Sequence, residues 1–311
     1  MRLLVMSYFS YQGHELMAEN QALTRIAEKF GTPCYVYSKK AIVDNWRSFA
    51  DIFDQHKKPY RIFYAIKANS NLAILNILAK LGAGFDAVSG GEIRRVLAAG
   101  GDAKRIVFSG VGKTSAEIDL AIDLGIHSIN IESEEELFRI QELAARKNKK
   151  IGIAVRINPD ISANSHPYIS TGGKENKFGV DYTKAEQIYS LAAQQPNLIV
   201  KGISCHIGSQ ITSLEPFLTV IEQLLKIISK LEANNINLEF IDIGGGLGVR
   251  YRDETPPTPA EYANALLPKL HGRKLKVYLE PGEAVGWQTG YLVATVLDVV
   301  KNGMNLIIGE I

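Results

Sequence analysis

The sequence predicts an α/β protein, a (β/α)8 TIM barrel with extra strands at both ends of the chain. From residue 61 onward, short apolar runs rich in β-branched and aromatic residues alternate with amphipathic helical stretches. There are eight such runs, the number that closes a parallel barrel. An open doubly wound sheet would instead carry a glycine-rich fingerprint after its first strand, and KANSNLA at 67–73 has none. The barrel is therefore the preferred fold.

The predicted barrel strands are short and mostly apolar, as expected for parallel strands that helices cover. Each run ends in Gly, Asn, Ser or a charged residue, where a loop can begin. In chain order, the runs are 61–67, 84–89, 105–110, 128–133, 151–158, 201–208, 239–245 and 276–282.

The stretches between the strands carry helix start and stop signals. Residues 70–82 have leucines at three- and four-residue spacing and end at a glycine, which is typical of a helix C-terminus. Ser133 and Glu136 have the spacing of a capping box at the start of another helix. Thr258 and Pro259 suit the cap and first turn of a third.

Strand-like runs also lie outside the eight barrel units. They occupy 3–9 and 33–38 near the N-terminus and 290–300 and 304–311 at the C-terminus. The last two flank Asn302-Gly303, a dipeptide that favours a two-residue hairpin turn. A two-stranded piece is marginal by itself, so we expect exposed apolar strands here to cause self-association.

Composition narrows the classes of partner. The chain is 46% hydrophobic and carries 35 basic against 33 acidic residues, which gives no reason to expect a nucleic-acid or membrane partner. The two cysteines, Cys34 and Cys205, are too few for a disulfide framework and lack metal-ligand spacing; the latter lies inside a predicted strand. The sequence predicts a cytoplasmic protein without a metal.

Polar residues and glycines gather at the carboxyl ends of the predicted strands, where barrel enzymes hold their substrates. Each has an ordinary structural explanation when taken singly: a core histidine, a tight turn or a helix cap. Together, a lysine at a strand tip and a glycine turn able to bind phosphate at a helix N-terminus suggest pyridoxal phosphate, whose aldehyde needs an amine. The residues at the predicted strand ends are Lys67, Asn69, Asp86, Arg156, His206, Ser209, Gly244, Gly245, Gly246, Glu280 and Gly282.

The chain resembles the diaminopimelate decarboxylases, within the alanine racemase/ornithine decarboxylase class of fold type III pyridoxal phosphate enzymes. The resemblance runs in order from about Tyr8 to about Gly282. It rests on the segments FYAIKANSN, GFDAVSGGEI, IVFSGVGKT, VRINPD, HPYISTGGKENKFG, CHIGSQ, DIGGGLGV and YLEPGE.

The resemblance implies decarboxylation of meso-diaminopimelate to L-lysine. It implies that Lys67 forms the Schiff base with the cofactor and that His206 stacks on its ring, these two being the catalytic residues. It also implies that Glu280 pairs with the ring nitrogen. The remaining cofactor contacts that it implies are Asp86 and Arg156 near the cofactor, Ser209, Gly245 and Gly246 at its phosphate, and Pro281, Gly282 and Glu283 after the last barrel strand.

Two departures from the family pattern leave room for a different function. Glu283 stands where the family usually has arginine, and the surrounding segment resembles carboxynorspermidine decarboxylase, which acts on a carboxylated polyamine. In the family, a C-terminal β domain adds a Cys-Glu-Ser-type loop and a tyrosine to the site of a homodimer, and this sequence ends at Ile311 without either. The sequence is also compatible with a pyridoxal phosphate-binding barrel that lacks decarboxylase activity, and with a barrel unrelated to this cofactor.

The resemblance also predicts the domain limits. Residues 1–38 would supply N-terminal strands of a β domain, 39–285 the cofactor-binding barrel, and 286–311 the start of a truncated C-terminal β domain. We expect the complete form to be a homodimer that takes a small amino-acid substrate. We expect weak or absent decarboxylation from the chain as it stands.

Overall fold

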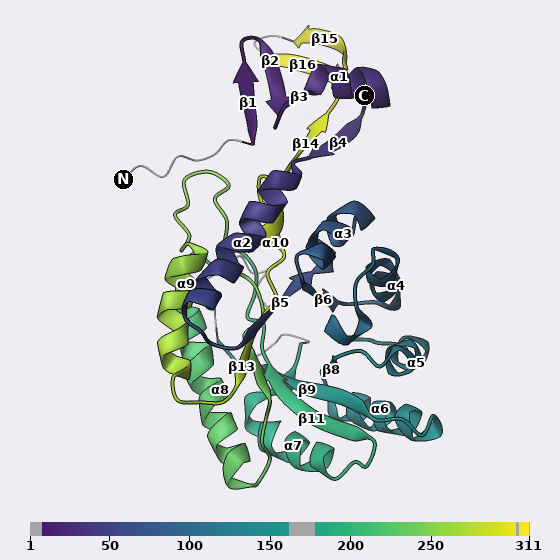
Figure 1. Ribbon diagram of the computed structural model, residues 1–311, viewed down its shortest axis with the longest axis vertical. Helices are drawn as coiled ribbons and strands as arrows, with labels where there is room; N and C mark the ends of the chain where they lie inside the picture. Colours follow the sequence, from purple (N-terminus) through teal and green to yellow (C-terminus); the bar gives the residue numbers. More distant parts are fainter. Residues whose placement is uncertain (1–7, 162–177, 303–304, 311) are drawn as a thin grey trace. The chain divides into compact units, whose positions relative to one another are not determined.

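The computed structural model describes residues 8–161, 178–302 and 305–310 (Figure 1). The chain forms two compact units, one from residues 1–45 with 286–311 and one from residues 46–285. The domain limits predicted from the sequence, after residues 38 and 285, stay predictions. Each unit is described separately below.

The larger unit contains the predicted barrel. Its eight parallel strands pair in the order β9-β11-β12-β13-β5-β6-β7-β8, and β8 pairs with β9 to close the ring. A two-residue strand, β10 (Val180–Asp181), adds to β9 outside the ring. The (β/α)8 fold is therefore confirmed. The barrel strands are β5 (Tyr60–Ala65), β6 (Gly84–Ala87), β7 (Ile106–Phe108), β8 (Ser128–Ile131), β9 (Ile151–Asn158), β11 (Leu198–Ser204), β12 (Phe240–Asp242) and β13 (Lys276–Leu279).

Helices follow the strands and lie around the outside of the ring (Figure 1). Their buried faces are mostly aliphatic, with some aromatic rings such as Phe53 and Phe217, since they cover the apolar outer side of the strands. Helix α2 (Lys39–Gln55) precedes β5, and α10 (Glu283–Gly286) follows β13. The helices between are α3 (Leu72–Lys80), α4 (Gly90–Ala98), α5 (Ser115–Leu124), α6 (Glu134–Arg146), α7 (Ala185–Ala193), α8 (Glu215–Ala233) and α9 (Pro259–Leu266), with 3-10 turns η1 (Ile66–Ala68), η2 (Ala103–Arg105), η3 (Tyr182–Lys184) and η4 (Leu267–Leu270).

The predicted helix caps are partly confirmed. Thr258 and Glu261 form a full capping box at the start of α9. Ser133 caps α6 by accepting from the Glu136 N–H, but the reciprocal half of that box is missing. The Glu136 carboxylate instead accepts from the Glu132 N–H and from the ammonium of Lys113, because a buried lysine must be paired.

All the barrel strands except β9 end earlier than predicted, and three of the differences affect the site. Strand β5 stops at Ala65, so Lys67 sits on the 3-10 turn η1 and not on the strand tip. Strand β11 stops at Ser204, which places Cys205 after the strand. The glycine turn follows β12 but no helix begins there, since α9 starts only at Pro259. The predicted phosphate site at a helix N-terminus is therefore wrong in that detail.

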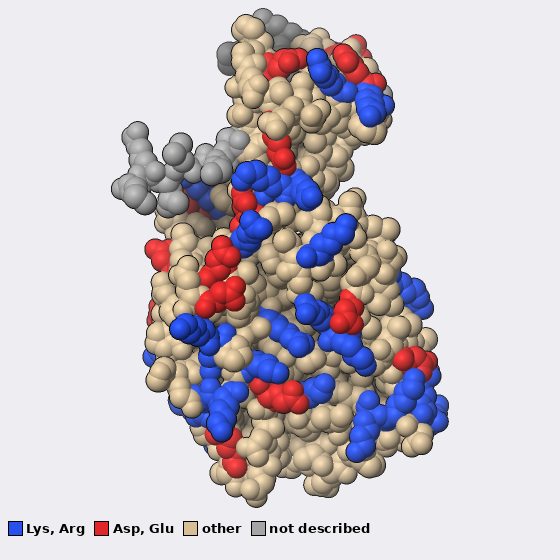
Figure 2. All heavy atoms as spheres, viewed as in Figure 1, with Lys and Arg blue, Asp and Glu red and all other residues tan. Residues whose placement is uncertain are grey.

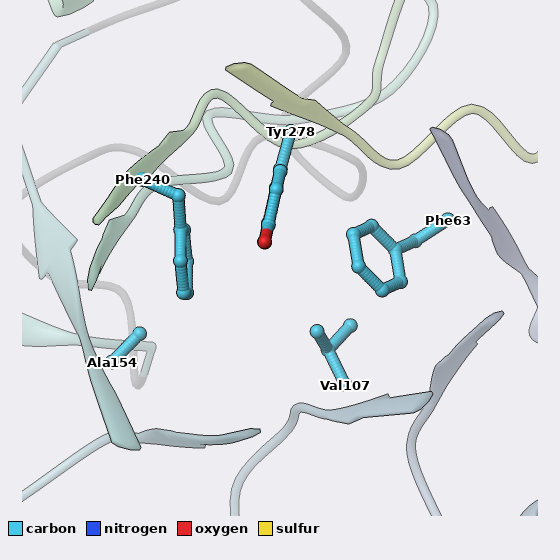
Figure 3. Close-up of a cluster of buried hydrophobic side chains, with 5 residues drawn as sticks. All are labelled: Phe63, Val107, Ala154, Phe240 and Tyr278. Atoms are coloured by element: carbon cyan, nitrogen blue, oxygen red, sulfur yellow. The ribbon is translucent and has the colours of Figure 1, made fainter. Parts of the chain in front are cut away.

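A layer of apolar side chains fills the middle of the barrel (Figure 3). Tyr278 and Phe240 stack with ring centroids 4.1 Å apart, and Phe63 lies 4.9 Å from Tyr278. His127, just before β8, forms a 3.0 Å hydrogen bond between its Nε2 and the Tyr278 hydroxyl. The five cluster members are all fully buried: Phe63, Val107, Ala154, Phe240 and Tyr278.

The smaller unit is made of strands from both ends of the chain. Strand β4 (Cys34–Tyr37) pairs with β14 (Gly290–Val293), and β15 (Val296–Asn302) pairs with β16 (Asn305–Glu310). A third sheet and one helix complete the unit. These are β1 (Phe9–Gln12), β2 (Glu15–Ala18), β3 (Gln21–Ala22) and α1 (Leu23–Phe30), which surround a small core of Phe9, Ala18 and Leu23.

The predicted hairpin near the C-terminus is present in a shifted register. Asn302 pairs with Asn305, so Asn302 belongs to β15 and not to the turn in which it was expected. Cross-strand pairing, not the Asn-Gly dipeptide, decides the register here. The turn itself lies outside the described residues, as does most of the predicted strand over 3–9.

The surface carries both signs of charge. On the face drawn in Figure 2, lysines and arginines are interspersed with aspartates and glutamates, in keeping with a net charge of +2. No described helix is both long and apolar enough to cross a membrane. The described residues also contain no group of three or more metal-ligating side chains.

Candidate active site

The side chains inside the barrel change from apolar to polar over two residues along its strands. Side chains two apart on a strand share a face, so the residues two positions after the apolar layer also point into the barrel. Phe240 is followed in this way by Asp242, and Tyr278 by Glu280. On neighbouring strands, Asp86 pairs with Ala65 and Ser204 pairs with Asp242, which places these residues at the same level. Asn130 joins the layer by donating through Nδ2 to Ser109 Oγ at 3.0 Å. The members of this polar layer are Ala65, Asp86, Ser109, Asn130, Arg156, Ser204, Asp242 and Glu280.

A cavity of about 520 Å³ opens above this layer at the carboxyl ends of the strands. That volume lies within the range of small-molecule and cofactor sites. The cavity brings together six of the predicted site residues: Lys67, Asp86, Arg156, His206, Ser209 and Glu280. Its other lining residues are Val88, Ser109, Gly110, Val111, Asn130, Phe178, Ser204 and Cys205.

Lys67 faces the cavity from η1, and its side chain is exposed. Among the described residues, no hydrogen bond or ion pair holds its ammonium. Lys113 provides the contrast, since it is 3% exposed and donates to Gly110 O at 2.6 Å, Asn130 O at 2.8 Å and Glu136 Oε1 at 3.1 Å. Lys113 is a structural lysine, whereas Lys67 is available to a ligand.

One buried ion pair, with the hydrogen bonds around it, holds the rim of the cavity in place. Glu132 Oε1 accepts from Arg156 Nη1 and from the Gly110 N–H, both at 3.0 Å, and its Oε2 accepts from the Gly179 N–H at 2.7 Å. The Arg156 guanidinium also lies 4.8 Å from the centroid of the Phe178 ring. The Glu132 carboxylate thereby links three elements: strand β9, the loop after β7 and the loop before β10.

Burial shifts the titration of the cavity's ionisable groups. Burial, with Lys67 and Arg156 nearby, holds the pKa of His206 well below its ordinary value, so its imidazole is neutral. Burial also raises the pKa of Asp86, while the positive charge of Lys67 opposes that rise. For Glu280, burial and then the neighbouring carboxyl of Asp242 hold the pKa well above the ordinary range.

The glycine turn after β12 brings three loops into close contact. A Cβ at Gly245 would lie 2.2 Å from Glu280 O, and one at Gly246 would lie 2.1 Å from Gly208 O. The Gly245 N–H donates to His206 Nδ1 at 3.4 Å, which fixes this imidazole beside the turn. The glycines are thus required by backbone packing, and they do not line the cavity.

The segment after β13 is likewise beside the cavity and not in its lining. Pro281 O accepts from the Ala65 N–H at 3.2 Å, and a Cβ at Gly282 would meet that of Ala65 at 3.1 Å. Glu283 hydrogen-bonds through Oε1 to the Tyr251 hydroxyl, so its carboxylate is engaged by the loop after β12. The predicted segment 166–177 lies outside the described residues.

Several buried polar atoms of the polar layer have no hydrogen-bond partner among the described residues. They include Asp86 Oδ1, Asn130 Oδ1, Ser204 Oγ and Glu280 Oε1. A buried polar atom without a partner is costly unless a ligand or water satisfies it. An exposed lysine at one wall and acidic groups on the floor fit pyridoxal phosphate, which carries an aldehyde and a basic ring nitrogen.

Sequence reasoning missed Ser109, Asn130 and Ser204 because each looked like an ordinary strand residue. The register of the folded barrel reveals Ser204, which lies opposite Arg156 on β9, and a 3.0 Å hydrogen bond from Asn130 Nδ2 to Ser109 Oγ links the other two. Phe178 and Val111 were missed for another reason. They lie in loops, whose path no periodicity reveals.

The chain matches a known family over most of its length. Residues 39–286 match the family described as "Pyridoxal-dependent decarboxylase, pyridoxal binding domain". The diaminopimelate decarboxylase of Pseudomonas aeruginosa is 51% identical over 291 residues, and that of Pseudomonas fluorescens is 52% identical over 292. Each of these alignments covers 94% of this chain and 70% of the relative.

Solved structures give the same result. Diaminopimelate decarboxylase from Helicobacter pylori complexed with L-lysine superposes with a TM-score of 0.88 at 40% identity, over 92% of this chain and 72% of that one. The enzyme of the same name from M. jannaschii in co-complex with L-lysine has a TM-score of 0.90 at 34% identity, over 96% of this chain and 72% of that one. This chain thus spans about 70% of the length of its relatives.

Proposed function

Because this chain belongs to the pyridoxal-dependent decarboxylase family, we propose that it removes one carboxylate from meso-diaminopimelate and releases L-lysine. Its cofactor is pyridoxal 5'-phosphate. The observation that carries the proposal is the cavity that joins the unpaired amine of Lys67 to the buried carboxyl of Glu280. The relatives' names supply the substrate, and no observation favours a carboxylated polyamine.

The cavity residues divide into those that would hold the cofactor and those that would exclude water. Lys67 would hold the aldehyde through its amine, Glu280 the ring nitrogen, and neutral His206 the ring face. Ser209 and the backbone of Gly245 and Gly246 would hold the phosphate. The apolar wall would keep water away from the reacting bond, and it is formed by Val88, Val111 and Phe178.

The reaction needs a place for the electron pair that the departing carboxylate leaves behind. Pyridoxal phosphate, when bound, supplies a ring that accepts that pair, and it does so best when the ring nitrogen is protonated. Glu280 would keep a proton at that nitrogen. Arg156, fixed by Glu132, would place a positive charge beside the cavity, and Asp86 would orient the amine of Lys67.

Carbon dioxide release from meso-diaminopimelate in the presence of pyridoxal phosphate tests the proposal. We expect L-lysine in equal amount from the purified chain and none from Lys67→Ala. The matched control is Lys80→Ala, which removes an exposed lysine from α3 outside the site. Cofactor absorbance without carbon dioxide would favour a binding protein without decarboxylase activity, and turnover of a carboxylated polyamine alone would refute the substrate.

A cytoplasmic location and a homodimer are further parts of the proposal. The reducing cytoplasm suits Cys34 and Cys205, both of which are free thiols. Cell fractionation and light scattering after size-exclusion chromatography test these two points. Recovery from an oxidising compartment, or a monomeric mass at working concentration, would contradict them.

A further inference from the structure

Asp242 is a fully buried carboxyl that the mechanism above does not use. It ends β12, is 0% exposed and is held by the Gly244 N–H, which donates to Oδ1 at 2.9 Å. Its other oxygen, Oδ2, has no donor with a fixed proton among the described residues. An isolated buried carboxylate is expensive, so the position needs an explanation.

The neighbouring residue Glu280 explains why a carboxyl is buried at this position. It stands two residues beyond Tyr278, just as Asp242 stands two beyond Phe240, and those two rings stack at 4.1 Å. The Glu280 N–H donates to Gly244 O at 2.8 Å, so Gly244 ties both backbones together. The two carboxyl groups interact directly, and Glu280 Oε1 and Asp242 Oδ2 are buried oxygens without a hydrogen-bond donor among the described residues.

Two ionised carboxylates cannot hydrogen-bond, because neither carries a proton. One shared proton satisfies both oxygens and removes one of two like charges from a dry site. Burial raises the pKa of Asp242 to about 6 and holds that of Glu280 well above its ordinary range, which supports a singly protonated pair at neutral pH. The charged groups facing the pair are Lys67, Asp86 and Arg156.

We propose that Asp242 is the positioning residue of Glu280, sharing one proton with it and taking that proton when a protonated ring nitrogen arrives. In the cavity without a ligand, Glu280 holds the proton and donates it to Asp242 Oδ2. When the ring N–H binds, the proton crosses to Asp242, which becomes the neutral donor, and Glu280 becomes the carboxylate that accepts from the ring. The number of protons on the pair stays at one. This inference rests on the proposed cofactor.

The matched variants are Asp242→Leu and Asp242→Asn. Leucine keeps the branched shape but cannot donate, so Glu280 retains its proton and meets the ring nitrogen as an acid. Asparagine can donate through Nδ2 and accept from Gly244, so it should replace the neutral aspartic acid. Ile241→Val, on the same strand with its side chain on the opposite face, is the control for disturbing β12 without touching the pair or the cavity lining.

The test compares the binding of pyridoxal 5'-phosphate with that of its 1-deaza analogue, which lacks the ring nitrogen. We expect Asp242→Leu to weaken binding of the natural cofactor about tenfold or more and to leave the analogue unchanged. Asp242→Asn and Ile241→Val should bind both like the unaltered chain. The ¹⁵N chemical shift of labelled cofactor should report a protonated ring in the unaltered chain and Asp242→Asn, and an unprotonated ring in Asp242→Leu.

Each contrary outcome has a definite meaning. Equal loss of both ligands in Asp242→Leu, or unchanged binding of the natural cofactor, would overturn the positioning role and leave the proposed function standing. A loss in Asp242→Asn as large as in Asp242→Leu would show that the negative charge matters and the shared proton does not. Failure of the unaltered chain to bind the cofactor would overturn the proposed function as well.

Discussion

Two layers of one barrel, separated by two residues along each strand, have opposite chemistry. The first is apolar and dry, with Phe240 and Tyr278 stacked and Phe63 packed beside them. The second carries carboxyl groups such as Asp242 and Glu280, with several oxygens that no described residue satisfies. The same strands therefore supply a closely packed apolar core below and the polar floor of the cavity above.

The difference shows how a barrel divides stability from function. Burial and close packing of the apolar layer stabilise the folded state, and tighter packing stabilises it further. The polar layer loses by burial and is kept only because a ligand completes it. Substitutions in the two layers should therefore affect different measurements: cofactor attachment and turnover for the polar layer, and unfolding free energy for the apolar one.

Lys67→Ala should abolish the attachment of cofactor that borohydride reduction makes permanent, and reduce decarboxylation by about 10³-fold or more. Its melting temperature should stay near that of the unaltered chain, since the amine has no partner to lose. Peptide mapping after reduction is the measurement, with Lys80→Ala as the matched control. A label on Lys113, or on Lys177 outside the described residues, would refute the assignment.

Phe240→Ala should lower the free energy of unfolding by about 3–5 kcal/mol, because it opens a cavity in the apolar layer. For a domain of this size that is roughly 10 °C in melting temperature. Cofactor affinity per folded molecule should not change. Phe138→Ala, which removes an exposed ring from α6, should cost far less; similar losses in both variants would contradict the division between layers.

Lys113→Met should cost about 3 kcal/mol of unfolding free energy, because it leaves the buried carboxylate of Glu136 with only the more distant Arg139, at 3.9 Å, as a charged partner. Adding Glu136→Gln should recover part of that loss. Chemical denaturation of the single and double variants measures the coupling. If Lys113→Met were neutral, the contrast between a structural lysine and the free Lys67 would fail.

His127→Gln should make stability less sensitive to acid. Burial lowers the pKa of His127 to about 3, whereas the unfolded chain binds that proton near pH 6.5. Between these values the unfolded state holds more protons, so the histidine's contribution to stability is lost as the pH falls from about 6.5 towards 3. Melting temperatures at about pH 7 and about pH 5 should differ more in the unaltered chain than in His127→Gln; an equal difference would contradict the shift.

Sequence patterns were sufficient for the barrel and for much of the site. The alternation of strand and helix predicted all eight strands, and strand ends predicted Lys67, Asp86, Arg156, His206 and Glu280, which line the cavity. Ser209 was also placed there. Gly245, Gly246 and Glu283 were expected at the cofactor and lie beside the lining, since a sequence motif indicates proximity but not the direction in which a group faces.

The sequence by itself determined where along the chain the barrel strands lie, though not where each one ends, because runs of β-branched and aromatic side chains favour a strand locally. It also determined the cofactor, through a lysine and glycines in a recognisable order. Only the tertiary structure decided that Asp242 meets Glu280, that Glu132 holds Arg156, and that Asn302 pairs with Asn305. The first two contacts depend on how strands align around the ring, and the third depends on the register of a hairpin in the smaller unit. No local pattern encodes either alignment.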